Sequence, residues 1–188
     1  MCTAGRCRSP VAAALLAKRL EALQTDVSVS SVGLRFTGEP TPDIGVSLMA
    51  ERGIDLTAHR STRITARDVH NADVILGMTR EHVREIVDID PNAWAKTYTL
   101  KDFVRRAQRV GPRRRRQRLD GWLDVVGAER TTRDVLGSNP DDEVHDPFGQ
   151  RPKVWQQVID DIDDLVSPIP ILLGVREARP SSTRAWTA

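Results

Sequence analysis

The sequence predicts an α/β fold of three layers, in which helices flank a parallel sheet. Segments with helical spacing of apolar residues alternate with short apolar runs between residues 9 and 100, the order typical of such folds. The pattern at 153–166 places its apolar residues on one helix face, which should pack on the sheet. With 188 residues, of which 39% are hydrophobic, the chain is long enough for one domain with a real core.

Each element of the N-terminal half has its own signal. Ser9 as N-cap and Pro10 in the first turn predict a helix over SPVAAALLAKRLEAL. Alternation that ends in Gly33 predicts a strand at 27–33. The remaining predicted elements are helices at 46–53, at 64–72 with Thr65 as cap, and at 79–89 with Thr79 as cap, a buried strand at 73–78, and an extended segment at 96–100.

The C-terminal half is more polar. Residues 101–133 are charged and mostly helical in pattern, with a break at GPRRRRQR (111–118), and 137–152 are predicted to form a loop. We expect a single phosphatase-like domain over 1–173, with 105–138 as a divergent basic insertion. The polar segment 174–188 is expected to be a disordered tail.

Composition and charge give no indication of a nucleic-acid partner or of a membrane span. The net charge of +2 does not indicate nucleic-acid binding. The arginine run at 113–116 is interpreted as a solvated face, with a polyanion-binding role left open. No apolar run approaches the roughly 20 residues of a membrane span, and no signal peptide is visible. Two cysteines in such a chain indicate a free thiol and a cytoplasmic location, while the oligomeric state is not predicted.

The chemistry is concentrated in CTAGRCRSP, residues 2–10. Cys2 and Arg8 stand in the spacing C-x5-R immediately before a helix, where backbone N–H groups of the loop can form an anion cradle. A cysteine in that positive potential favours its thiolate, and the planar fork of Arg8 can hold two phosphate oxygens. Ser9 can donate a hydrogen bond to the sulfur. The pattern predicts covalent phosphoryl transfer through phosphocysteine.

Such a reaction needs an acid to protonate the leaving oxygen, and DPF at 146–148 supplies a candidate in Asp146. Asp141 and Asp142 compete with it on chemistry alone, but neither precedes a proline. Phe36 and Phe148 could flank an aromatic substrate or could be ordinary loop packing.

Four segments in this order resemble the low-molecular-weight protein tyrosine phosphatases. They are CTAGRCRSP, GIDLTAHRSTRIT (53–65), ADVILGM (72–78) and DPF. The resemblance runs from residue 2 to about residue 170 and is weakest at 105–138.

The resemblance implies a role for each matching residue. Cys2 is the nucleophile, and Asp146 is the general acid and then the general base. Cys7 is similar to a second cysteine that can pair with the nucleophile under oxidation. No metal or cofactor is implied. The residues implied to bind phosphate are Thr3, Ala4, Gly5, Arg6, Cys7, Arg8 and Ser9.

Two departures from the family pattern stand out. Ala4-Gly5 replaces the usual Gly-Asn, so we expect Gly5 to keep the left-handed backbone but the contact with His59 to be lost and the loop to be looser. Only Met1 precedes Cys2, where the family has an apolar strand. The sheet is therefore expected to lack its first central strand, and the natural start is expected to lie upstream.

Three functions remain open on the sequence. The first is a phosphatase for phosphotyrosine in proteins or for small aryl phosphates. The second is an arsenate reductase that uses an external small thiol, although Asp146 favours the phosphatase because arsenate reduction has no ester oxygen to protonate. The third is a non-catalytic phosphate-binding module.

Overall fold

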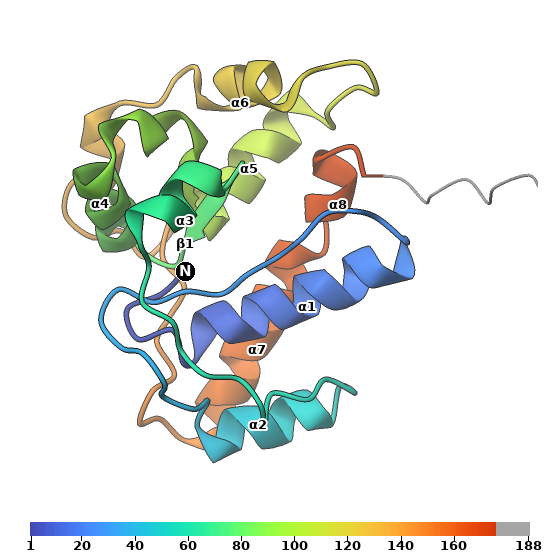
Figure 1. Cartoon of the computed structure of the whole chain (residues 1–188), viewed down its shortest axis with the longest axis vertical. Coiled ribbons are helices and arrows are strands. Elements are labelled where there is room, and N and C mark those ends of the chain that lie inside the picture. The colour runs from blue at the N-terminus through green and yellow to red at the C-terminus, as the bar shows by residue number, and fades with distance from the viewer. Residues whose placement is uncertain (176–188) are drawn as a thin grey trace, which may run out of the picture.

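The fold is described from a computed structural model, which describes residues 1–175 (Figure 1). The predicted tail therefore lies, from residue 176 onward, outside the described residues. The helices and strands in chain order are α1 (Arg8–Ala22), α2 (Asp43–Ala50), α3 (Ala66–Asn71), β1 (Ile75–Gly77), α4 (Arg80–Ile89), η1 (Pro91–Lys96), β2 (Thr97–Thr99), α5 (Leu100–Val110), α6 (Leu119–Gly127), η2 (Thr132–Val135), α7 (Pro152–Val166) and α8 (Ile169–Leu172).

A narrow parallel sheet runs through the middle of the molecule. β1 and β2 pair in parallel, with Ile75 opposite Thr97. On the other side of β1, the Met78 N–H donates to the Met1 carbonyl at 3.1 Å, and Cys2 forms a parallel bridge with Gly33. Gly33 in turn bridges Arg63 in parallel. Met1 and Cys2 thus occupy the central position of the sheet, between Gly33 and β1.

The predicted strand at 27–33 is wrong in extent, because only Gly33 pairs as a bridge. A parallel ladder needs a run of partners on the neighbouring segment. Among the described residues, the segments next to 27–33 supply little more than single backbone hydrogen bonds. The Cys2 N–H donates to the Val32 carbonyl at 3.3 Å, and the Gly33 N–H donates to the Thr62 carbonyl at 2.8 Å.

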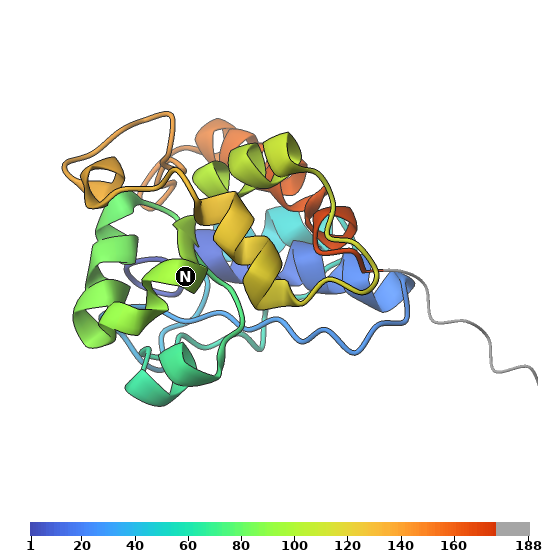
Figure 2. The same ribbon diagram turned by 90° about the horizontal axis from the view of Figure 1, so that it is seen from above.

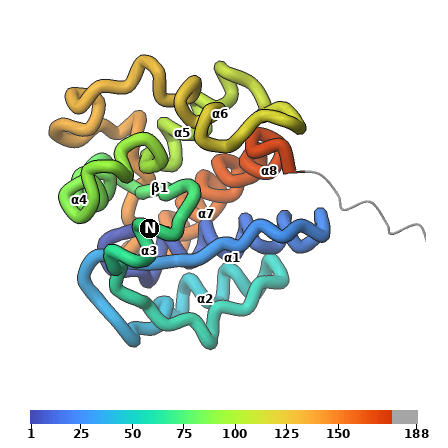
Figure 3. Tube along the Cα trace, turned by 45° about the horizontal axis from the view of Figure 1, so that its top comes forward, coloured from blue at the N-terminus to red at the C-terminus, as the bar shows by residue number. Residues whose placement is uncertain are grey.

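Helices cover both faces of this sheet, which confirms the predicted α/β fold. The larger hydrophobic cluster on one face takes residues from α1, α2, α5, α6, α7 and α8, whereas the smaller cluster on the other face takes residues from α3, α4 and η1. Figure 1 shows β1 and the N-terminus between α1 and α4. The tube in Figure 3 shows the same arrangement from another direction. Alternate residues face opposite layers, since Met1 and Ile75 join one hydrophobic cluster and Cys2 and Leu76 pack in the other.

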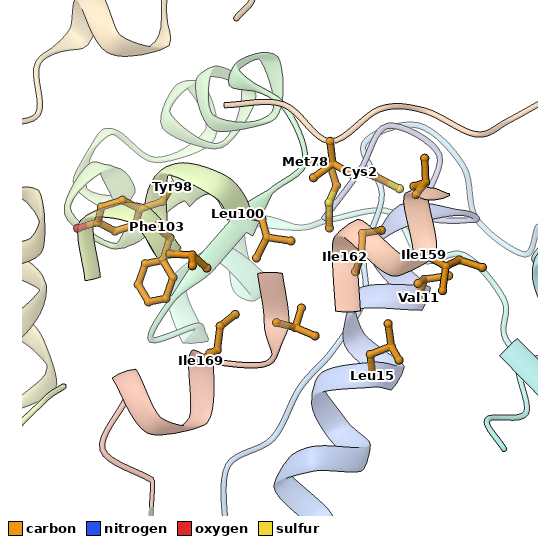
Figure 4. Packing of buried hydrophobic residues seen from close by; sticks show 14 of the residues in the cluster. Cys2, Val11, Leu15, Met78, Tyr98, Leu100, Phe103, Ile159, Ile162 and Ile169 are labelled. Carbon is orange, nitrogen blue, oxygen red and sulfur yellow. The ribbon is translucent and has the colours of Figure 1, made fainter. Parts of the chain in front are cut away.

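The larger cluster lies where α1 and α7 pack against each other and the sheet. In Figure 4, Val11 and Leu15 of α1 approach Ile159 and Ile162 of α7, with Cys2 at the edge of the group. The apolar face predicted for α7 is confirmed by the burial of Trp155, Val158, Ile159, Ile162 and Val166. This packing fixes the first turn of α1 next to Cys2.

Most helix boundaries follow their sequence signals. Thr65 and Asp68 form a reciprocal capping box at α3, and Thr79 precedes α4 as predicted. α2 begins at Asp43, three residues before the predicted helix, with Pro42 at the N-cap position and no side-chain capping hydrogen bond. α8 had no sequence prediction. No helix within residues 1–175 is long and apolar enough to cross a membrane.

Candidate active site

The site is built around Cys2, which enters a loop as soon as the chain leaves the sheet. Its sulfur is buried, and it lies 3.1 Å from the Ser9 hydroxyl oxygen in the first turn of α1. Ser31 donates to the same hydroxyl at 3.0 Å, so the Ser9 proton is free for an acceptor of its own. The Val32 carbonyl is more distant at 3.4 Å, which favours the sulfur as that acceptor. Ser9 is therefore a sulfur partner inside α1, not the N-cap that its sequence position suggested.

The surroundings of Cys2 favour its thiolate. Burial alone would raise the pKa of Cys2, but hydrogen bonds from the Ser9 hydroxyl and backbone N–H, together with the positive charges of the N-terminus and Arg8, lower it below its ordinary value. Burial also lowers the pKa of the Met1 amino group to about 6, so that group is largely neutral at neutral pH. At neutral pH, Ser9 and Arg8 therefore remain as the groups that stabilise the Cys2 thiolate.

The second thiol in the loop has the opposite environment. Burial first, and then the negative charge of Asp146, raise the pKa of Cys7 to about 12. Cys7 is thus a neutral thiol at physiological pH. Both cysteines are free, and the oxidative pairing of Cys7 with Cys2 stays a prediction.

Between Cys2 and α1 the chain makes a tight loop of bends over residues 3–7. Within residues 1–175, the backbone N–H groups of residues 3–7 donate no hydrogen bond to another protein group. Unpaired N–H groups that precede a helix N-terminus are the donors of an anion-binding loop. The geometry agrees with the predicted cradle.

Two glycines let this loop close against the sheet. Gly5 has a φ of +65°, the left-handed conformation that was expected of it. A Cβ on Gly33 would lie 2.6 Å from the Gly5 nitrogen and 2.7 Å from the Ala4 carbonyl carbon, so only glycine fits at position 33.

The predicted loss of the histidine contact is wrong. His59 Nε2 lies 2.8 Å from the Gly5 carbonyl oxygen, which makes His59 the donor. A backbone acceptor replaces the side-chain acceptor that the family pattern would supply, and the loop stays tied to the 59–61 segment.

Arg8 joins the loop to a segment far along the chain. Its guanidinium is buried, and it donates to the Val144 carbonyl at 3.0 Å and to Asp146 Oδ2 at 2.7 Å. Asp146 is half-exposed and its other oxygen accepts the Phe148 N–H at 3.2 Å. The Arg8 Nε–H is buried and has no hydrogen-bond partner among the described residues. The predicted acid and the predicted phosphate-binding arginine are therefore in direct contact.

His82 supports the loop from the other side, and sequence analysis did not select it. Its Nδ1 accepts the Thr79 N–H at 2.9 Å, which leaves Nε2–H to donate to the Thr3 hydroxyl at 3.0 Å. Burial, followed by the positive charges of Arg8 and the N-terminus, lowers the pKa of His82 to about 3. A Cβ on Gly77 would lie 2.8 Å from the His82 Cβ, so Gly77 provides the room. The capping position of His82, three residues after Thr79, was its only visible signal.

The rim of the site is cationic and aromatic. Arg6 lies 5.4 Å from the centre of the exposed Phe148 ring, donates to the Pro40 carbonyl at 3.0 Å and contacts Glu39 at 3.5 Å. Phe36 is also exposed, one residue after Arg35, whose N–H donates to the Thr3 carbonyl at 3.2 Å. Both predicted flanking aromatics thus lie on segments next to the loop.

Comparison with known proteins agrees with this geometry. A family model described as low molecular weight phosphotyrosine protein phosphatase matches residues 1–111, more than half of the chain. The chain belongs to this family.

Relatives of this low molecular weight phosphatase include proteins named for two different substrates. The chain is 30% identical to the low molecular weight protein-tyrosine-phosphatase Etp of Escherichia coli, over 68% of this chain and 82% of Etp. It is also 30% identical to a protein-arginine-phosphatase of Geobacillus stearothermophilus, over 88% of each chain. Among solved structures, the phosphatase from T. tengcongensis superposes with a TM-score of 0.67 at 25% identity, covering 89% of this chain and 92% of the other.

Removal of the Ser9 hydroxyl tests the electrostatics of this phosphatase. Ser9→Ala should raise the pKa of Cys2, because the sulfur loses its O–H donor while it stays buried. The pH dependence of iodoacetamide alkylation, read by mass spectrometry, should shift to higher pH. In Cys2→Ser, no thiol should titrate below the ordinary cysteine value of 9.0, since Cys7 titrates near 12. An unchanged profile in Ser9→Ala would contradict the assignment.

The neutral His82 predicts a pH-dependent stability. Its folded pKa of about 3 lies below the ordinary 6.5, so between these values the unfolded chain binds more protons and the free energy of unfolding rises with pH. The stabilisation is complete above pH 6.5 and is lost as the pH falls towards 3. From about pH 7 to about pH 5, urea unfolding of the wild type should lose about 2 kcal/mol more than that of His82→Gln. His70 is exposed, so His70→Gln serves as the control and should lose as much unfolding free energy over this pH range as the wild type.

Proposed function

We propose that the chain hydrolyses phosphate monoesters of tyrosine side chains, or small aryl phosphates, through a phosphocysteine formed on Cys2. One observation supports this above all. A cysteine with a lowered pKa opens a loop whose N–H groups at 3–7 and buried Arg8 Nε–H have no partner in residues 1–175. Such unpaired donors next to the sulfur support a binding place for a phosphoryl group in line with Cys2.

In the proposed first step, the Cys2 thiolate attacks phosphorus and the bond to the ester oxygen breaks. The N–H groups of the loop and Arg8 stabilise the equatorial oxygens as charge builds on them. Asp146, in its protonated form, gives its proton to the leaving oxygen. Because Arg8 contacts Asp146 at 2.7 Å, bound phosphate competes for the guanidinium and frees the carboxyl group for this role.

In the proposed second step, Asp146 accepts a proton from water while the water oxygen attacks phosphorus. The P–S bond breaks, inorganic phosphate forms, and the thiolate returns to its hydrogen bond with Ser9. The steps use neither a metal nor a cofactor. No group of three His, Cys, Asp or Glu side chains in the described part of the chain is arranged to hold a metal ion.

The relatives raise a second candidate substrate, phosphoarginine. Its leaving guanidine becomes a cation when it is protonated. Arg6, whose charge is partly balanced by Glu39 at 3.5 Å, places a positive group beside Phe148, two residues from Asp146, where the leaving group would emerge. Repulsion between like charges disfavours a guanidinium there, whereas a phenol can pack against Phe148. We therefore favour the aryl phosphate.

Arsenate reduction and non-catalytic phosphate binding have less support. Neither Etp nor the protein-arginine-phosphatase is named as an arsenate reductase, and Asp146 lies where an ester oxygen could be protonated. A non-catalytic module would not need a thiolate-stabilising Ser9 behind Cys2. The cytoplasmic location stays a prediction.

Two substitutions test the proposed chemistry. Cys2→Ser should abolish hydrolysis of para-nitrophenyl phosphate and of a phosphotyrosine peptide, because the nucleophile is gone. Asp146→Asn should reduce kcat/KM for the peptide by about a hundredfold or more, because an unprotonated phenolate leaves poorly. Phosphate binding should persist in both by isothermal titration calorimetry. Binding by the wild type without turnover would support the non-catalytic module instead.

The substrate preference is tested at Arg6. Removal of its charge in Arg6→Gln should raise the ratio of phosphoarginine-peptide to phosphotyrosine-peptide turnover by about fivefold, equivalent to about 1 kcal/mol of repulsion. The exposed Arg114→Gln, which makes the same change in net charge, is the control. An equal change of this ratio in both variants would contradict the proposed role of Arg6 in substrate preference.

A further inference from the structure

The segment that bears Asp146 has no regular structure of its own. Between η2 and α7, residues 136–151 form turns and coil. Figures 1 and 2 show this orange segment running beside α4 before it enters α7. A general acid must be held within hydrogen-bond reach of the leaving oxygen, so something other than a helix or strand has to fix this segment.

A buried carboxylate lies four residues before Asp146. The side chain of Asp142 is only 6% exposed. One of its oxygens accepts from Arg80 in the first turn of α4, at 2.9 Å from Nε and with a second contact from Nη2. Its other oxygen accepts from Arg105 of α5 at 2.8 Å. Asp142 thus accepts hydrogen bonds from two helices, α4 and α5.

Further side chains from the same two helices hold the backbone around it. Their donors all bind carbonyl oxygens, which fixes the path of the chain rather than one side chain. The contacts are Arg80 with Leu136 at 3.0 Å, Arg84 with Gly137 at 2.9 Å and with Val135, and Lys101 with Pro140 at 3.2 Å.

The contacts of Asp142 with Arg80 and Arg105, called the Asp142 clamp below, are connected to the active site through Val144. The Val144 N–H donates to the Met78 carbonyl at 2.8 Å, and the Val144 carbonyl accepts from Arg8 at 3.0 Å. Met78 lies between β1 and α4, and Arg80 is the first residue of α4. The segment is therefore held at Asp142 by α4 and α5 and at Val144 by Met78, and Asp146 follows two residues after Val144.

Asp142 cannot itself be the acid, although it competes with Asp146 on chemistry alone. Its burial would raise its pKa, but the hydrogen bonds from Arg80 and Arg105 lower it below the ordinary range. It is an ionised carboxylate with both oxygens occupied. Asp141 next to it is exposed.

We propose that Asp142, clamped by Arg80 and Arg105, is a positioning residue that sets the place of Asp146 over the phosphoryl group. This inference rests on the proposed general-acid role of Asp146. It also gives a function to one basic residue of the 105–138 region, Arg105, which the phosphatase motifs leave unexplained. Arg105 contacts both Asp142 and Asp102, so it connects α5 to the acid segment.

The test uses the dependence of rate on the leaving group. Phenyl phosphate needs the acid far more than para-nitrophenyl phosphate does, because nitrophenolate leaves without help. Asp142→Asn should lower kcat/KM for phenyl phosphate by about tenfold or more and should affect para-nitrophenyl phosphate much less. The ratio kcat/KM is used because it includes only steps up to phenol release. Asp141→Asn is the matched control and should leave both rates unchanged.

A second variant guards against misfolding. Asp142→Asn leaves the partly buried Arg80 without its charge partner, whereas Arg105→Gln removes only one of the two arginines, and that one is half-exposed. Arg105→Gln should shift the ratio of the two rates in the same direction and keep the wild-type circular dichroism spectrum. In an Asp146→Asn background, Asp142→Asn should add nothing to the loss with phenyl phosphate.

The outcomes separate the inference from the proposed function. An active wild type whose ratio is unmoved by both clamp variants would overturn the positioning role and leave the phosphatase function intact. An equal loss with both substrates, or a further loss in the Asp146→Asn background, would show a merely structural clamp and would also overturn it. A wild type without hydrolytic activity would overturn the proposed function, and the positioning role with it.

Discussion

The buried guanidinium of Arg8 is the interaction on which the rest of the site depends. It stands in the first turn of α1 and reaches a carbonyl and a carboxylate that are 136 and 138 residues away in sequence. A buried charge is costly unless it is paired, so the fold must deliver both partners to it. The loop and the acid segment meet at this group, and the packing of α1 on α7 holds its helix turn in place. Its remaining Nε–H has no partner among the described residues, which supports the proposed role of Arg8 in phosphate binding.

The sheet supplies the second constraint, because the loop can form only where its backbone approaches the backbone of Gly33 closely. Gly33 allows the Ala4–Gly5 peptide to lie against it, and the His59 ring and the His82 ring fix the loop from two sides. Preorganised donors of this kind do not have to reorient when charge develops on a substrate, which is why they stabilise transition states well. A backbone hydrogen bond from Val144 to Met78 connects this loop region to the acid segment.

Local signals made much of this predictable. The spacing of Cys2, Arg8 and Ser9 before Pro10 indicated the loop and helix, and apolar periodicity indicated α7. Contacts between distant segments were not predictable. Whether 27–33 forms a strand depends on its neighbours, and a backbone carbonyl that replaces a side-chain acceptor for His59 leaves no trace in the sequence. The Asp142 clamp likewise requires two helices to converge on one carboxylate.

The most direct test of the account is to trap the covalent intermediate on Cys2. The wild-type chain would be mixed with para-nitrophenyl phosphate, quenched in acid within milliseconds, and analysed as intact protein and as peptides by mass spectrometry. The account predicts one added phosphoryl group, on the peptide that contains Cys2, and none in Cys2→Ser. Turnover without any phosphorylated Cys2 peptide, or a phosphoryl group on another residue, would contradict it.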